Sequence, residues 1–156
     1  MKNKKTYWII FYTVLALAID LAGRVFATHF TLPIWFDSIG TFLIAYIGGP
    51  VCGGIVGFTN NIIYGIFVEQ QSVYCIAGAL IGVLAGYFAK KKVFETQFAT
   101  MTFGMCLALV STAIAVAINT LLYDGQCGNV WGNQVMLMCM DSGLSRYLSY
   151  VIGQFC

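Results

Sequence analysis

The sequence has very little charge, and this scarcity limits the class of protein more than any motif does. Only 9% of its 156 residues are Asp, Glu, Lys or Arg, whereas 60% are hydrophobic. Because about a quarter of the residues in a soluble domain are charged, we predict an all-α integral membrane protein. About 20 apolar residues cross a bilayer as a helix, so the chain has room for five or six spans in a single transmembrane domain, residues 1–156.

The usual signatures of enzymes and metal sites are also missing. There is one histidine, no H-E-x-x-H sequence and no G-x-S-x-G sequence, which argues against the common metal and serine hydrolases. No Walker A sequence is present, so ATP hydrolysis by that route is excluded. The six cysteines form no C-x-x-C pair, and most lie in apolar segments, where a thiol behaves as a small hydrophobic group. We expect no enzyme activity, no metal, no cofactor and no nucleic-acid partner.

The apolar segments predict a bundle of six transmembrane helices joined by short loops. Their expected ranges are about 6–28, 36–48, 51–68, 72–89, 97–122 and 134–156. The second range is short, so a re-entrant segment is an alternative there. Lysines gather before the first helix and again at 90–92, and both clusters belong in the cytoplasm by the positive-inside rule. Four crossings between them is the simplest count, with a cytoplasmic N-terminus.

Glycines recur every four residues in two of these helices. Such spacing places small residues on one helix face, where a neighbouring backbone can approach closely. We expect packing within the chain, with a docking face for another subunit as the alternative. The two ladders are Gly49, Gly53 and Gly57, and Gly78, Gly82 and Gly86.

The first and last helices each carry an acidic and a basic residue. Asp20 and Arg24 are one turn apart, so they are expected to form a local ion pair with Arg24 reaching outward, with ligand contact as the alternative. Asp141 and Arg146 are five residues apart and do not share a face, so each needs its own partner. Arg24 is a candidate partner for Asp141.

The remaining polar and aromatic residues of the apolar segments are candidates for ligand binding. Asp37 is expected either to cap the following helix or to bind a cationic or N–H-donating ligand group. Trp35 and Trp131 are expected to anchor the outer interface or to stack on a heteroaromatic ligand. Asparagines and tyrosines on two helices form either a hydrogen-bond network or a ligand site in the outer half of the membrane. They are Asn60, Asn61, Tyr64, Asn119 and Tyr123.

Three strings of the sequence carry a family resemblance. They are LPIWFDSIGTFLIAYIGGPVCGGIVGFTNNIIYGI at 32–66, AKKK at 89–92 and NTLLYDGQCGNVWGN at 119–133. Over roughly residues 23–133 the chain resembles the substrate-binding S components of energy-coupling factor (ECF) transporters. The resemblance implies a six-helix bundle in a prokaryotic plasma membrane that binds a vitamin or similar micronutrient near its outer face.

The resemblance also implies partners. A transmembrane coupling subunit and ATPase subunits would complete the importer, and the A-x-x-x-A pattern of helix 1, Ala18 and Ala22, would pack against the coupling subunit. The chain stops at Cys156 without the charged cytoplasmic end that such proteins usually have, so we expect a truncated chain or an incomplete last helix.

These inferences combine into one expected function with two rivals. The chain is expected to be the substrate-capture subunit of an ECF-type importer, and its ligand to be vitamin-like, such as a nitrogen heteroaromatic. The rivals are a membrane sensor or scaffold that signals to a partner, and a self-sufficient secondary transporter. The residues expected to bind the ligand are Trp35, Asp37, Asn60, Tyr64, Asn119 and Trp131.

Overall fold

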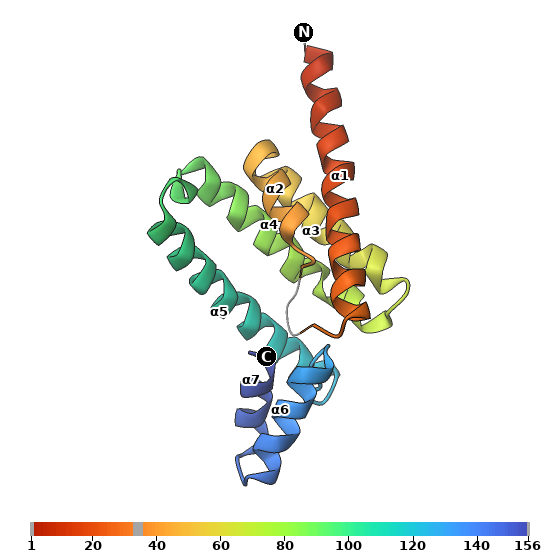
Figure 1. Cartoon of the computed structure of the whole chain (residues 1–156), viewed down its shortest axis with the longest axis vertical. Helices are drawn as coiled ribbons and strands as arrows, with labels where there is room; N and C mark the ends of the chain where they lie inside the picture. Colours follow the sequence, from red (N-terminus) through yellow and green to blue (C-terminus); the bar gives the residue numbers. More distant parts are fainter. Residues whose placement is uncertain (1, 33–35, 156) are drawn as a thin grey trace. The chain divides into compact units, whose positions relative to one another are not determined.

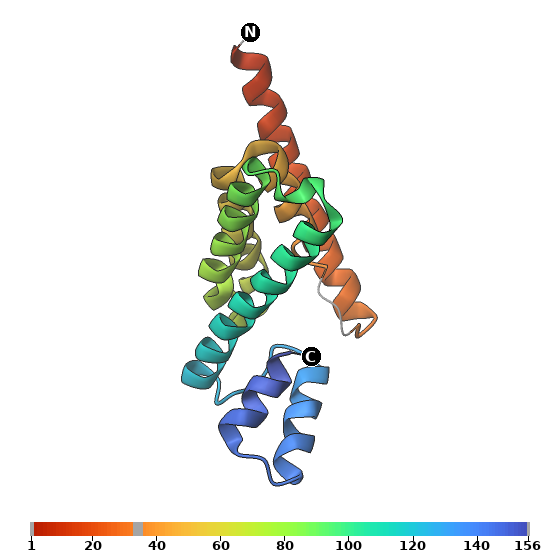
Figure 2. The same cartoon turned by 90° about the vertical axis from the view of Figure 1, so that its left-hand side faces the viewer.

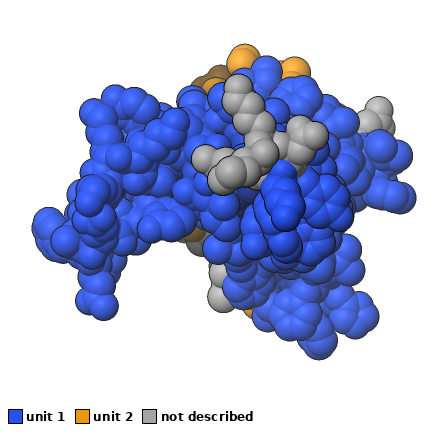
Figure 3. Space-filling model, turned by 90° about the horizontal axis from the view of Figure 1, so that it is seen from above, with its two compact units in different colours: residues 1–104 blue, residues 105–156 orange. Residues whose placement is uncertain are grey.

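The computed structural model describes residues 2–32 and 36–155, and all the regular structure in these ranges is helical. The expected all-α class is therefore confirmed. The elements in chain order are α1 (Lys2–His29), α2 (Ile39–Gly48), α3 (Pro50–Gly65), η1 (Glu69–Tyr74), α4 (Cys75–Lys90), η2 (Val93–Glu95), α5 (Gln97–Leu122), α6 (Val130–Asp141) and α7 (Arg146–Gln154) (Figure 1). They form two compact units, residues 1–104 and residues 105–156, and the boundary between them falls within α5 (Figure 3).

Three of the described helical segments are long and apolar enough to cross a membrane. They are Thr6–His29, Gln71–Lys90 and Gln97–Leu122. Large apolar side chains such as Trp8, Phe11 and Met105 are exposed along them. A soluble protein rarely exposes so much contiguous apolar surface, whereas a membrane helix presents it to lipid. The fold therefore indicates a membrane protein.

The first unit brings α3 and α4 together through the two glycine ladders. A Cβ atom added at Gly57 would lie 2.1 Å from the carbonyl oxygen of Gly78, and one at Gly82 would lie 2.1 Å from that of Gly53. This pairing is the register of antiparallel helices whose backbones touch, which only glycine permits. The glycines of these ladders thus pack within the chain, as expected.

Helix α2 is shorter than expected and begins at Ile39 rather than at residue 36. At 1.5 Å per residue its ten residues reach about 15 Å, half of a bilayer core. It ends at Gly48 because Gly49 adopts a φ of 84°, which an L side chain resists, and Pro50 then opens α3. Helix α2 alone is therefore too short for a complete crossing.

The N-terminal end of α1 and the turn between α4 and α5 lie toward the same end of the first unit (Figures 1 and 2). Both lysine clusters belong to these two places. If the chain crosses the membrane an even number of times between the two lysine clusters, both clusters lie on the same side of it, and this arrangement agrees with that expectation.

The second unit corrects the expectation of one last helix at 134–156. Residues 130–154 instead form two helices, α6 and α7, which pack against each other where Gly132 and Gly153 meet. Helix α6 stops in a Schellman motif: Gly143 has a φ of 87° and donates to Met140 O, while Leu144 donates to Cys139 O. The Ser142-Gly143 pair is the local stop signal. Neither helix alone is long enough to cross a bilayer.

Candidate functional site

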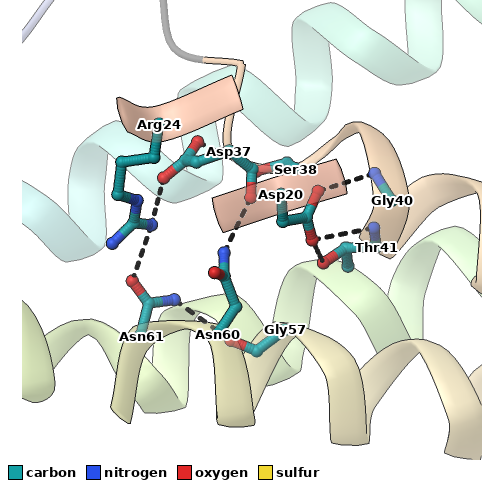
Figure 4. A network of polar contacts seen from close by, with 9 residues as sticks. All are labelled: Asp20, Arg24, Asp37, Ser38, Gly40, Thr41, Gly57, Asn60 and Asn61. Carbon is teal, nitrogen blue, oxygen red and sulfur yellow. Dashed lines mark hydrogen bonds and ion pairs between the residues drawn. The ribbon is translucent and has the colours of Figure 1, made fainter. Parts of the chain in front are cut away.

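A buried polar cluster joins α1, the start of α2 and α3 in the first unit (Figure 4). Its side chains come from two adjacent turns of α1, from the residue Asp37 before α2, from the first turn of α2, and from one turn of α3. Every residue of it belongs to residues 1–104, so a single unit positions it. The cluster residues are Asp20, Arg24, Asp37, Thr41, Asn60 and Asn61.

Asp20 caps α2 from another helix. Its carboxylate accepts hydrogen bonds from the backbone N–H groups of Gly40 (2.6 Å) and Thr41 (3.0 Å) and from the Thr41 hydroxyl (2.6 Å). The first N–H groups of a helix have no partner within it and favour a negative charge. Asp20 is fully buried. The contact requires Gly40, because a Cβ there would lie 2.0 Å from the carbonyl oxygen of Ala16.

Arg24, which is buried, forms an ion pair with the partly buried Asp37, not with Asp20. The same Nη2 donates to Asn61 Oδ1 at 3.1 Å, and the guanidinium lies over the Tyr64 ring at 4.6 Å from its centre. The Arg24 side chain is only 1% exposed, so the expected local pair with Asp20 and outward reach of Arg24 are wrong. The reason is that the Asp20 carboxylate already accepts the hydrogen bonds of the first turn of α2, so Arg24 pairs with Asp37 instead. Asp141, for which Arg24 was a candidate partner, belongs to the second unit.

Two asparagines of α3 complete the cluster. Asn60 donates from Nδ2 to the backbone carbonyl of Asp37 at 2.8 Å, and Asn61 donates to Gly57 O at 3.0 Å. Asp37 is therefore held through both its side chain and its backbone. Its expected alternative as a helix cap is wrong, because α2 is preceded by Ser38 and capped by Asp20.

Three polar atoms of this cluster are buried without a hydrogen-bond partner in residues 2–32 and 36–155. They are Nε and Nη1 of Arg24 and Oδ1 of Asn60. Burying such groups unpaired costs about 1–3 kcal/mol each, and more for a charged group. Native proteins rarely retain such atoms without a reason. The cluster thus leaves two nitrogen atoms of Arg24 and one carbonyl oxygen of Asn60 unpaired among the described residues.

The structure unites only some of the expected ligand-binding residues. Asp37 and Asn60 belong to the cluster, and the ring of Tyr64 contacts Arg24. Trp35 lies outside the described residues. Asn119, which is buried in α5, and Trp131, which is exposed in the first turn of α6, belong to the second unit.

The sequence reasoning missed Gly40 and Thr41 and assigned Arg24 to the wrong partner. One signal was available: Ala16, Asp20, Arg24 and Ala27 are spaced along a single face of α1, and all four are buried. Ala18 and Ala22 lie on other faces of α1 and are exposed. The A-x-x-x-A pattern is thus open to contact, while Asp20 within it points into the cluster.

A second polar group lies at the surface of the second unit. Arg146 pairs with Asp124 at 2.5 Å and donates to the Tyr150 hydroxyl. Both charged side chains are exposed, so this group resembles an ordinary surface ion pair. It supplies the partner that the sequence left open for Arg146.

Comparisons with known proteins add no family to this picture: no family model matches the chain, and neither a curated protein nor a solved structure matches it.

Replacing Asp20 with alanine is expected to destabilise the protein by about 1–2 kcal/mol, because the first N–H groups of α2 lose their acceptor. The free energy of unfolding in detergent, followed by tryptophan fluorescence, measures this loss. Ser38→Ala is the matched control, since Ser38 occupies the cap position but its side chain makes no cap bond. An equal loss in both variants would contradict the capping role of Asp20.

Proposed function

We propose that this chain is the substrate-capture subunit of an ECF-type importer. It binds a vitamin-like micronutrient near the outer face of a prokaryotic plasma membrane. A transmembrane coupling subunit and ATPase subunits then deliver the ligand inward. In this proposal the chain crosses the membrane several times, its N-terminus is cytoplasmic, and it is not itself an enzyme.

The observation that carries the proposal is the buried polar cluster with three unpartnered atoms. Asp20 and Arg24 lie in the second half of a segment, Thr6–His29, that is apolar enough to cross a membrane. With the proposed cytoplasmic N-terminus, this half is the outer one. Polar groups at membrane depth are costly and usually face a binding site or a pathway for a solute. A cluster that only stabilised the bundle would gain by pairing all of its atoms.

The free atoms define the chemistry of the ligand. The unpaired Nε and Nη1 of Arg24 require an acceptor, such as a ring nitrogen or a carbonyl or carboxylate oxygen. The free Asn60 carbonyl oxygen requires an N–H or O–H donor. A nitrogen heteroaromatic ring that carries both kinds of group satisfies this set. Asp37 does not bind a cationic group in this arrangement, since Arg24 already holds its carboxylate.

Ala18 and Ala22 are the residues proposed to pack against the coupling subunit. Both are exposed on α1, and their small side chains would let a partner helix approach closely. Ala22 also borders a shallow apolar hollow of about 470 Å³ on the surface of α1, which Leu21, Val25 and Phe26 help to line. This face of α1 lies away from the polar cluster.

The test is native mass spectrometry of the chain purified in detergent from its own host without added ligand. We expect a retained small molecule, with coupling and ATPase subunits in the preparation before harsher washing. An empty chain that co-purifies with a kinase or cyclase would overturn the proposal and favour the sensor.

Asn60→Ala is expected to weaken binding of the retained molecule about 5- to 150-fold, the effect of losing a buried hydrogen-bond partner. Once its mass identifies the ligand, fluorescence titration of wild type and variant measures the affinity. Thr102→Ala is the control, because the Thr102 hydroxyl is exposed and bonds only within α5. Poor expression of Asn60→Ala with unchanged affinity in the surviving protein would instead indicate a purely structural network.

A further inference from the structure

A second polar site lies at the other end of the first unit, remote from the buried cluster. A hollow of about 290 Å³ opens where α2 and α4 end and η2 begins. Its lining residues are Tyr46, Ala89, Lys90, Lys92, Phe94 and Glu95. None of these residues takes part in the proposed capture of a substrate.

The side chain of Lys90 lies close to Gly49, in the turn between α2 and α3. A Cβ added at Gly49 would lie 3.2 Å from Lys90 Cε and 3.5 Å from Nζ, so the lysine stem lies along Gly49. Lys90 forms no ion pair with any side chain that the structure describes. Lys92 does pair with Glu95, at 3.1 Å, but both groups are exposed and such pairs are weak. An incoming anion can therefore bind Lys90 and compete for Lys92.

The other walls of the hollow are aromatic and apolar. The rings of Tyr46 and Phe94 lie 6.4 Å apart, and Phe94 is in turn supported by Phe103 at 5.2 Å. Exposed apolar side chains, Ile47 and Val51, continue from the same turn along α2 and α3. The ammonium groups suit the phosphate of a phospholipid, and the aromatic rings and the apolar helix surface suit its interfacial part and its acyl chains.

We propose that this hollow binds a phosphate group through Lys90 and Lys92, with Tyr46 and Phe94 packing against the remainder of the ligand. Basic pockets between helices at the cytoplasmic side of membrane proteins suit anionic headgroups. A phospholipid headgroup and a free phosphate share this chemistry, and the lipid alone uses the apolar surface beside the hollow. The site would anchor the turns at which α2 and α4 end.

The test uses the full chain in detergent, titrated with dioleoylphosphatidylglycerol, with dioleoylphosphatidylcholine or with inorganic phosphate, and bound ligand is counted by native mass spectrometry. We expect the anionic lipid to bind best. Lys90→Gln should lower its occupancy about fivefold, the factor that one lysine near an anionic headgroup contributes. Lys92→Gln provides a second variant of the same site.

Lys91→Gln is the matched control, because Lys91 turns away from the hollow and lies over the Tyr87 ring at 4.8 Å. It removes the same charge and should leave lipid occupancy unchanged. If inorganic phosphate displaces the lipid in the wild type but binds poorly to Lys90→Gln, the phosphate site is supported and a soluble ligand becomes its source. Equal losses in Lys90→Gln and Lys91→Gln, or equal binding of both lipids, would overturn the proposal.

Discussion

Replacing Arg24 with methionine is expected to destabilise the protein by about 3–5 kcal/mol, since it leaves one charge of a buried pair without its partner. Methionine keeps much of the volume of the side chain but donates no hydrogen bond. Asp37 would lose its cationic partner, and Asn61 Oδ1 would lose its donor. Chemical unfolding in detergent, followed by tryptophan fluorescence, measures the loss.

The chain contains its own control for this result. Arg146 and Asp124 also form an arginine–aspartate pair, but an exposed one. Arg146→Met should therefore change stability little. The double variant Arg24→Met/Asp37→Leu should recover much of the stability lost in Arg24→Met, because no unpaired charge remains buried. Equal effects of Arg24→Met and Arg146→Met would show that the Arg24 pair is not buried as described.

Replacing Gly57 with alanine is expected to destabilise the protein by roughly 1–3 kcal/mol, the usual cost of overpacking. The new methyl group would lie 2.1 Å from the carbonyl oxygen of Gly78 and 2.6 Å from its carbonyl carbon, and both atoms belong to the backbone of α4. No side chain can rotate away to make room. The two helices must therefore separate.

Gly104→Ala tests the same substitution where there is space. Nothing lies within 4 Å of the added methyl group at Gly104, which is also in a helix interior. Alanine favours a helix over glycine by up to about 1 kcal/mol, so this variant should be neutral or slightly more stable. The thermal unfolding temperature should therefore fall in Gly57→Ala and stay the same or rise in Gly104→Ala. A stable Gly57→Ala protein would contradict the backbone contact between α3 and α4.

The sequence predicted the helix ranges well where a long apolar segment by itself defines the helix. The range 97–122 matches α5, and the expected ranges of the first and third helices overlap α1 and α3 closely. The last helix was mispredicted because Gly143 adopts a left-handed conformation, which hydropathy averaged over many residues does not detect. The short α2 was identified, but its start depended on a cap that comes from α1.

The candidate site was predictable only in part. Asn60, Tyr64 and Asp37 were singled out because polar residues are conspicuous in apolar segments. Their partners were not predictable, since Asp20 and Arg24 are also correctly spaced to pair with each other. Asn119 and Trp131 were grouped with them by expected depth in the membrane, whereas the structure places these two residues in another compact unit.

By itself the sequence determined that this is a helical membrane protein, because hydropathy and segment length act locally and require no knowledge of neighbours. It also determined which helix faces could pack closely, through the spacing of the glycines. Only the tertiary structure decided which charges pair. Gly40 lets the start of α2 rest on Ala16, and this contact brings the first N–H groups of α2 to Asp20. Arg24 therefore pairs with Asp37, and its Nε and Nη1 have no hydrogen-bond partner among the described residues.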